Sequence, residues 1–404
     1  MTSVDRAAAP ADASLLSRSF VTVSVVTFLF FVYVGVLIPL VPRLIEEQLG
    51  GTELDIGLNL ATFSVAAIAV RPLLGKWGDR HGRRVLIIGG ALLASAAVLA
   101  ATLVSDRWML LPLRALMGAG EGALFVGAAT LVNDLAPAHR RAEAASYFSA
   151  AVFLGIGLGP IIGEQLIGEA SFDRGLVAAG LFTLAAAAAA TLLDDDRPER
   201  SSDSPPHVIP ANRFHRAALR PGAVLACGIG GFATFNAFVP EHARAVGLEG
   251  SKWVFALFSV ICLVVRVVGA RVPERIGLAT AVSIALAGLA IGLATIGAVG
   301  TPVGLFAGTA VIAVGMSFLY PSLSAIAVNS APSPDRTQVV STFTMFFEVG
   351  SAIGGLLFGL VAELTSKRGG FIGGSMAATA GLVVLWTVLL PWARTSTTHS
   401  SDFR

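Results

Sequence analysis

The sequence predicts an all-α membrane protein with twelve transmembrane helices in two pseudo-symmetric six-helix halves. Apolar residues make up 55% of its 404 residues and charged residues only 13%, whereas an ordinary soluble domain carries about 25% charge. Twelve long apolar runs follow one another along the chain. One long polar stretch interrupts them near the middle, which indicates two halves.

The apolar runs give the expected helices in order. The first run, Phe20–Leu40, is too long for the apolar core of a signal peptide and therefore reads as a membrane span. The runs are long enough to cross the hydrocarbon layer as helices. The expected spans are 19–43, 54–74, 85–104, 108–132, 143–166, 174–193, 219–240, 252–271, 278–298, 302–328, 338–363 and 371–391.

The polar segments divide the chain. The stretch 194–218 holds three consecutive aspartates, several serines and a Pro-Pro pair, and such a polar segment cannot pack into a core. We expect a disordered cytoplasmic N-terminus (1–18), an N-terminal half (19–193), a cytoplasmic linker (194–218), a C-terminal half (219–391) and a cytoplasmic tail (392–404).

Basic residues predict the orientation. With the N-terminus inside, the cytoplasmic segments hold 18 of the 28 Lys and Arg residues and the external loops hold seven. Cytoplasmic loops of membrane proteins carry the excess of Lys and Arg. Both termini are therefore expected in the cytoplasm of a protein embedded in the cell membrane.

Several function classes find no support. Cys227 and Cys262 both lie in apolar runs, so neither a disulfide framework nor a metal site is indicated. The chain has no phosphate-binding loop, no paired catalytic acids on a loop and no basic patch of the kind that binds nucleic acid. We expect no enzyme activity, cofactor or nucleic-acid partner, but a monomer that works in the bilayer on a small-molecule substrate and protons.

The segment between the second and third spans carries the most specific motif. Its sequence, Gly-Lys-Trp-Gly-Asp-Arg-His-Gly-Arg-Arg over 75–84, is too polar for hydrocarbon and predicts a tight loop at the membrane surface. It resembles motif A of the major facilitator superfamily. The resemblance implies a conformational latch, although a surface loop held by its basic charge is the alternative. The latch candidates here are Arg71, Gly75, Asp79, Arg80, Gly82 and Arg83.

The motif returns in the second half. At an offset of 195 residues Arg71 aligns with Arg266, and the latch candidates of the second half are Arg266, Glu274, Arg275 and Gly277. The same offset, without a gap, aligns Gly120 with Gly315, Gly155 with Gly350 and Gly159 with Gly354. Parallel six-helix repeats are the architecture of this superfamily, which predicts a major facilitator fold over nearly the whole chain.

The fourth span carries two charges, Arg114 and Glu121, and resembles the family's motif B, with Met117 where Gln is common. A charge at the bilayer centre costs about 2.5–3.5 kcal/mol, so both side chains should face a polar cavity or a partner. They share one helix face, but Arg114 leans away from Glu121, which argues against a direct pair. Glu121 is a candidate proton site because desolvation favours the neutral carboxyl. The alternative is an ionised glutamate paired with an arginine on another helix.

The eleventh span holds Glu348 near its middle, a second candidate for proton or cation binding. The alternative is a permanently neutral carboxyl hydrogen-bonded to Asn236 or Tyr320. The candidates for lining a substrate cavity are Arg114, Tyr33, Asn236 and Tyr320, although an aromatic residue such as Tyr33 can equally belong to a helix core.

The fifth span carries a stripe of glycines, Gly155, Gly159 and Gly163, with Pro160, which predicts close helix packing. It resembles motif C, which in the superfamily accompanies drug–proton antiporters, although Glu164 stands where a glycine is usual. A generic packing helix is the alternative. The resemblance implies a secondary transporter that exports small, partly apolar compounds by proton antiport. Uptake of a sugar or organic acid, with Arg114 binding an anionic group, remains open.

Overall fold

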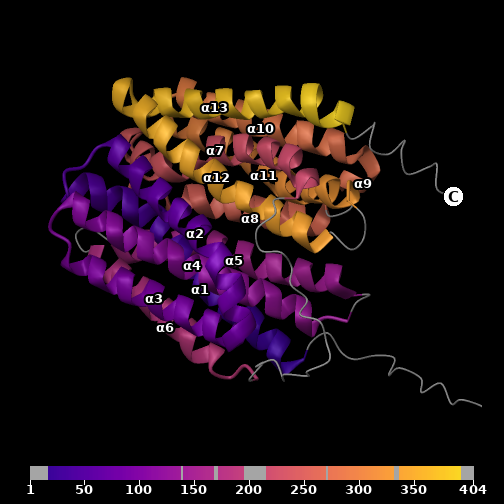
Figure 1. Cartoon of the computed structure of the whole chain (residues 1–404). Coiled ribbons are helices and arrows are strands. Elements are labelled where there is room, and N and C mark those ends of the chain that lie inside the picture. The colour runs from indigo at the N-terminus through magenta and orange to yellow at the C-terminus, as the bar shows by residue number, and fades with distance from the viewer. Residues whose placement is uncertain are drawn as a thin grey trace, which may run out of the picture.

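The computed structural model describes residues 17–137, 140–167, 172–194, 215–269, 272–331 and 336–392, and these segments are almost entirely helical. The helices run side by side in two bundles, with α1–α6 below and α7–α13 above in Figure 1. Most of the predicted N-terminal segment, linker and tail (1–16, 195–214 and 393–404) lie outside the described residues. The all-α fold predicted from the apolar runs is confirmed.

Six long helices form each bundle. The first bundle comprises α1 (Arg18–Arg43), η1 (Leu44–Gln48), α2 (Glu53–His81), α3 (Arg83–Ala100), η2 (Ala101–Leu103), α4 (Arg107–Leu135), α5 (Arg141–Ile167) and α6 (Phe172–Ala190). The second comprises α7 (Arg216–Ala245), α8 (Lys252–Val268), α9 (Val272–Ile276), α10 (Leu278–Ala298), α11 (Pro302–Asn329), α12 (Arg336–Leu364), α13 (Lys367–Val384) and η5 (Leu385–Leu389). Within the described residues, eleven helical segments are long and apolar enough to cross a membrane. The remaining expected span, α8, has 17 residues.

Short polar side chains fix where several helices begin. Ser17, Asp106 and Ser366 each precede a helix and accept a hydrogen bond from a backbone N–H of its first turn. Thr52 and Asp55 form a capping box at the start of α2, with 2.9 Å between the Thr52 nitrogen and the Asp55 carboxylate. These caps satisfy donors that an apolar environment would leave unpaired.

The 195-residue repeat reappears as equivalent contacts. Gly159 of α5 packs on Gly35 of α1 so closely that a Cβ on Gly159 would lie 2.5 Å from the Gly35 Cα. Gly354 of α12 packs on Gly230 of α7 in the same way, and both glycines lie 195 residues further on. The turns Gly82 and Gly277 also share a positive φ, of 89° and 86°. The two halves therefore repeat in structure as the sequence predicted.

The polar motif at 75–84 is not the loop that the sequence suggested. Helix α2 continues through it to His81, and Gly82 alone separates α2 from α3. A helix can leave the membrane without breaking because its backbone hydrogen bonds are internal. The turn needs Gly82 because φ of 89° with ψ of 157° is a region that glycine alone adopts readily.

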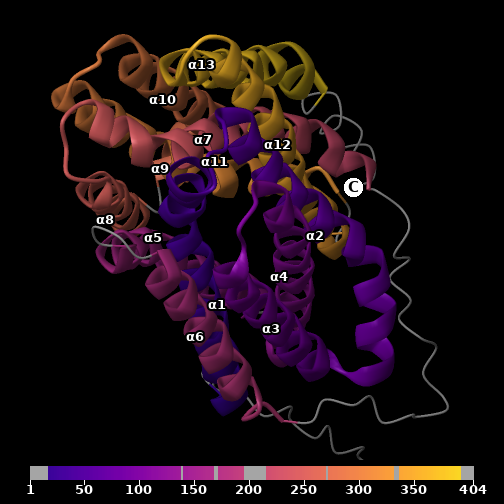
Figure 2. The same cartoon turned by 90° about the vertical axis from the view of Figure 1, so that its left-hand side faces the viewer.

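The halves meet between α1 and α7 and along two further interfaces that the repeat relates. Figure 2 shows α2 beside α12 on one side of the molecule and α5 beside α8 on the other. In the α2–α12 interface Gly57 faces Gly355 and Gly359, with no room for a side chain on Gly57. We call the end of the bundles at which α13 begins the Lys367 end, and the opposite end, at which α3 begins, the Arg83 end.

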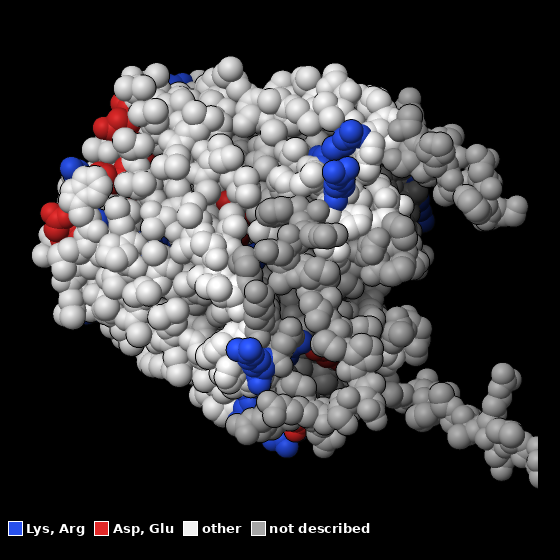
Figure 3. Space-filling view, viewed as in Figure 1, with Lys and Arg blue, Asp and Glu red and all other residues white. Residues whose placement is uncertain are grey.

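Charge is distributed as a membrane requires. On the face shown in Figure 3, most charged side chains lie towards the two ends of the helices, and a broad band between them is almost entirely white. Many side chains along the helices are large, apolar and exposed, among them Leu181, Ile291 and Leu357. Such a surface matches hydrocarbon rather than water.

Candidate functional site

Two glutamates from opposite halves lie close together inside the molecule. Glu121 of α4 is 5% exposed and Glu348 of α12 is 8% exposed. Each carboxyl lies within electrostatic range of the Arg71 guanidinium of α2, and Glu121 also lies within range of Glu348. The structure therefore brings the two proton-site candidates together around one arginine.

Arg71 lies within electrostatic range of both carboxyls without an ion pair to either. It forms no ion pair with a described carboxylate, its buried Nε has no hydrogen-bond partner, and its guanidinium lies over the Phe125 ring at 5.6 Å. The Ser64 hydroxyl of α2 interacts with Glu348. Among the described residues neither Asn236 nor Tyr320 forms a hydrogen bond with Glu348, although α7 as well as α2 packs directly on α12.

A second buried group occupies the core of the first half. Tyr33 of α1 is fully buried and Arg114 of α4 is 7% exposed. The Tyr33 hydroxyl, the Arg114 Nε and one Glu121 oxygen are all buried without a hydrogen-bond partner among the described residues. Arg114 makes only a weak contact to the Met117 sulfur at 3.8 Å and lies over the Phe63 ring at 4.7 Å. Burying three polar groups without hydrogen-bond partners in one region costs free energy. This region is therefore a candidate site for binding a polar group of a substrate.

Asn236 and Tyr320, the other cavity candidates, are half-buried in the second half. The Tyr320 ring lies 5.5 Å from Phe343 of α12 and 6.5 Å from Phe153 of α5, measured between ring centroids. It also lies within electrostatic range of Arg71. Tyr320 therefore sits where the two halves face each other.

The latch candidates divide into two groups. The side chains of Asp79 and Glu274 are not among those that the structure describes, while Arg80 and Arg275 are exposed. Arg83 lies 3.7 Å from the Asp134 carboxylate of α4. Contacts of Arg83 thus link α3 with α4 inside one half, and the latch itself stays a prediction.

The glycine stripe of α5 faces α1. A Cβ on Gly155 would lie 2.8 Å from backbone atoms of Phe28 and Phe31, and one on Gly163 would lie 2.7 Å from the Val36 carbonyl oxygen. Pro160 lies within the same helix. These contacts are the close packing that glycine stripes permit between membrane helices.

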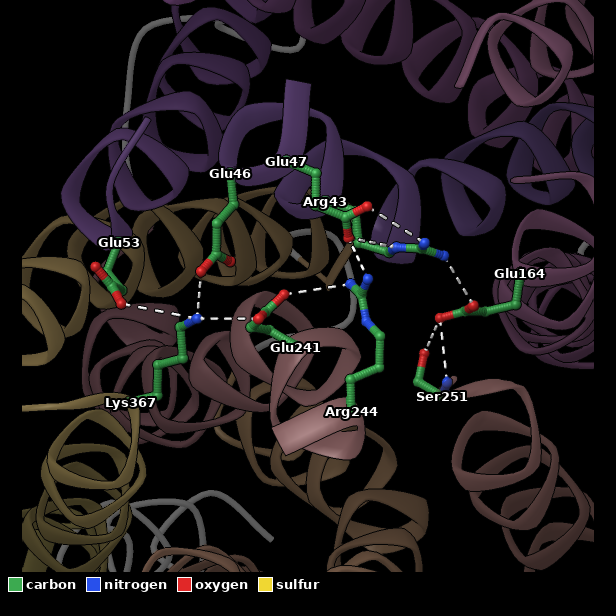
Figure 4. A network of polar contacts seen from close by, with 9 residues as sticks. All are labelled: Arg43, Glu46, Glu47, Glu53, Glu164, Glu241, Arg244, Ser251 and Lys367. Carbon is green, nitrogen blue, oxygen red and sulfur yellow. Dashed lines mark hydrogen bonds and ion pairs between the residues drawn. The ribbon is translucent and has the colours of Figure 1, made fainter. Parts of the chain in front are cut away.

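Charged side chains at the Lys367 end form a network that joins the halves (Figure 4). Lys367 of α13 pairs with Glu46 of η1, lies 3.8 Å from Glu53 of α2 and lies 3.5 Å from Glu241 of its own half. Arg244 of α7 pairs with Glu47 of η1. Among the described residues, these ion pairs hold the Lys367 end of the two halves together.

The network extends to Glu164, the residue that departs from motif C. Its carboxylate lies 3.3 Å from an Arg43 nitrogen and accepts hydrogen bonds from the backbone and hydroxyl of Ser251 (Figure 4). Ser251 belongs to the second half, so Glu164 bridges the halves where a glycine could not. The sequence reading missed this network. The available signal was the pair Glu46 and Glu47 directly after the first span, together with basic residues beside later spans on the same side of the membrane, Arg244 after the seventh and Lys367 before the twelfth.

Comparison with known proteins agrees with this architecture. Residues 23–251 and 222–403 match the family profile described as Major Facilitator Superfamily. An uncharacterized MFS-type transporter of Salmonella typhimurium is 24% identical over 375 residues, which cover 91% of this chain and 95% of the relative.

Solved structures show the same fold. The nucleoside transporter NupG superposes with a TM-score of 0.73 at 14% identity and covers 91% of this chain and 99% of its own. The human organic anion transporter MFSD10 gives 0.68 at 19% identity, with 91% and 99% covered. Identities this low show the fold alone. The family profile covers nearly the whole chain, and the protein is therefore a secondary transporter, not an enzyme, that belongs to the Major Facilitator Superfamily.

Proposed function

We propose that the protein exports small, partly apolar compounds across the cell membrane in exchange for protons, with both of its termini in the cytoplasm. The single observation that carries the proposal is the approach of Glu121 and Glu348, from opposite halves, around Arg71. Protonation of either carboxyl changes the charge at the interface between the halves. It can therefore favour one arrangement of the halves over the other.

Replacing either glutamate tests the coupling. In proteoliposomes with an imposed pH gradient, Glu121→Gln or Glu348→Gln is expected to remove gradient-driven flux while substrate exchange at equal pH continues. Glutamine keeps the shape of the side chain but has no group that gains or loses a proton near neutral pH. Flux measured in both directions, together with resistance profiles of expressing cells, also separates export from uptake.

Glu249 supplies the matched control, because it is an exposed glutamate near the start of α8 with no role in the buried group. Glu249→Gln is expected to transport like the wild type. Gradient-driven flux that survives in both interior variants would refute the proton sites.

Alternating access would require the Lys367 end to open and close. Lys367→Met leaves Glu46, Glu53 and Glu241 facing one another without their shared counter-ion. Their repulsion is expected to shift the equilibrium towards an open Lys367 end by about tenfold. Spin-label distances between the halves at this end measure the shift.

Lys252 at the start of α8 is the control for that shift, since its ammonium lies over the Trp253 ring at 5.8 Å outside the network. Lys252→Met should leave the distances unchanged. An unchanged distance distribution in Lys367→Met would mean that the network does not hold this end closed.

One observation favours a second candidate function, the uptake of an organic acid. Arg114 is buried without a carboxylate partner among the described residues, and a substrate anion could supply one. In that case Arg114→Gln should abolish uptake of the acid in the two-directional flux assay above.

A further inference from the structure

The repeat gives Arg71 and Arg266 equivalent surroundings in the two interfaces. Each arginine follows an interfacial serine by seven residues, about two helix turns. The serines are Ser64 in α2 and Ser259 in α8, and they are also 195 residues apart. Arg71 lies over the Phe125 ring. The residue equivalent to Phe125 in the second half is Tyr320.

The two interfaces differ in the residue that lies beside the arginine. In the α2–α12 interface, Arg71 lies within electrostatic range of Glu348. The residue equivalent to Glu348 in α5 is Phe153, and the Arg266 guanidinium lies 3.6 Å from the centroid of the Phe153 ring. An aromatic face therefore replaces the carboxylate beside Arg266.

Arg266 consequently has no internal counter-ion. Its buried Nε has no hydrogen-bond partner, and it forms no ion pair with a carboxylate of the described residues. The titratable side chain within electrostatic range of Arg266 is the Cys262 thiol. That thiol donates a hydrogen bond to the Ala313 carbonyl oxygen at 3.4 Å. An arginine in the interior of a membrane protein normally has a partner, so one is missing here.

We propose that Arg266, Phe153 and Tyr320 form a binding site for a carboxylate with an apolar, aromatic body, which rests on the transport function proposed above. The substrate carboxylate takes the place at Arg266 that Glu348 holds at Arg71. Two guanidinium N–H groups along one edge, Nε–H among them, suit a carboxylate in a bidentate pair.

The surrounding side chains fit the rest of such a molecule. Phe153 covers the face of the guanidinium and leaves its edge to the anion. The rings of Phe153 and Tyr320 meet edge to face, with 6.5 Å between their centroids. Phe153 belongs to α5 of the first half and Tyr320 to α11 of the second. A ligand held by all three residues would contact both halves, so its binding would report on their relative position.

The test is equilibrium binding of 1-naphthoate to the purified full-length protein in detergent, measured by calorimetry. Its neutral amide, 1-naphthamide, has nearly the same shape. We expect naphthoate to bind at least about tenfold more tightly than the amide, and Arg266→Gln to remove this preference. Arg266→Lys keeps the positive charge but loses the paired N–H donors of the guanidinium. This variant should therefore retain part of the preference for naphthoate over the amide.

A second variant tests the comparison between the interfaces. Phe153→Glu places a carboxylate beside Arg266, as Glu348 stands beside Arg71, and should abolish naphthoate binding by supplying the counter-ion internally. Arg220 of α7 is the control, because its guanidinium lies over the Trp392 ring, 5.0 Å from the ring centroid, and away from this site. Arg220→Gln should bind naphthoate like the wild type.

The outcomes separate cleanly. Absence of naphthoate binding, equal binding of the amide, or wild-type binding by Arg266→Gln would each overturn the site. Should Phe153→Glu fail to fold, the Gln and Lys variants of Arg266 decide alone. The assay uses no pH gradient, so failure of the proton sites in the flux assay leaves this result standing, and the reverse also holds.

Discussion

Leucine at position 57 is expected to prevent the Lys367 end from closing. Gly57 of α2 lies against Gly355 and Gly359 of α12, and even a Cβ on Gly57 would overlap the Gly355 carbonyl oxygen. Overpacking of this kind costs about 1–3 kcal/mol, which shifts the open-to-closed equilibrium roughly 5- to 150-fold. Transport should be lost because the cycle needs both states.

Spin-label distances across the Lys367 end would measure the shift, and flux would measure its consequence. Gly89 of α3 provides the control, since a Cβ there meets nothing within 4 Å. Gly89→Leu should preserve both readouts. A Gly57→Leu protein that still closes at this end would show that α2 and α12 can separate without opening it.

Leucine at position 159 should act on stability instead. Gly159 touches Gly35 inside the first half, with a Cβ position only 2.5 Å from the Val32 carbonyl oxygen and the Gly35 Cα. This contact belongs to the bundle α1–α6 and persists whichever way the halves are arranged. We expect a loss of about 3 kcal/mol or more, because backbone atoms rather than flexible side chains block the leucine.

Thermal unfolding in detergent would detect that loss as a lower midpoint. The equivalent substitution Gly354→Leu, against Gly230 in the second half, should give a similar fall, since the repeat reproduces the contact. Unchanged unfolding of both variants would contradict the packing described here. Together with Gly57→Leu, the pair separates contacts within a half from contacts between halves.

Much of this fold follows from local sequence. Apolar runs of about 20 residues are expected to cross a bilayer as helices, because the backbone there must be satisfied internally and a strand of a closed barrel needs only about 10 residues. The 195-residue offset also predicted which glycines are equivalent. The expected loop at 75–84 was wrong, because polarity shows where a helix leaves the membrane and not where it ends. The actual turn is at Gly82, which has a positive φ.

The site was less predictable. Glu121 and Glu348 stand out in sequence as acids within apolar runs, but no local pattern tells that Arg71 lies within electrostatic range of both. That arrangement depends on how α2, α4 and α12 meet. The ion pairs of Lys367 were missed for a related reason: a glutamate at the end of a span looks the same whether it faces water or the other half.

The short π-helical turn η1 places two neighbouring carboxylates against different helices of the opposite bundle. Glu46 pairs with Lys367 of α13, and Glu47 pairs with Arg244 of α7. If α7 or α13 moved away from η1 before the other helix did, one of these adjacent glutamates would lose its counter-ion while the other stayed paired. The five residues of η1 thus require α7 and α13 to separate from the first bundle together. The second bundle is therefore expected to move as a rigid unit rather than helix by helix.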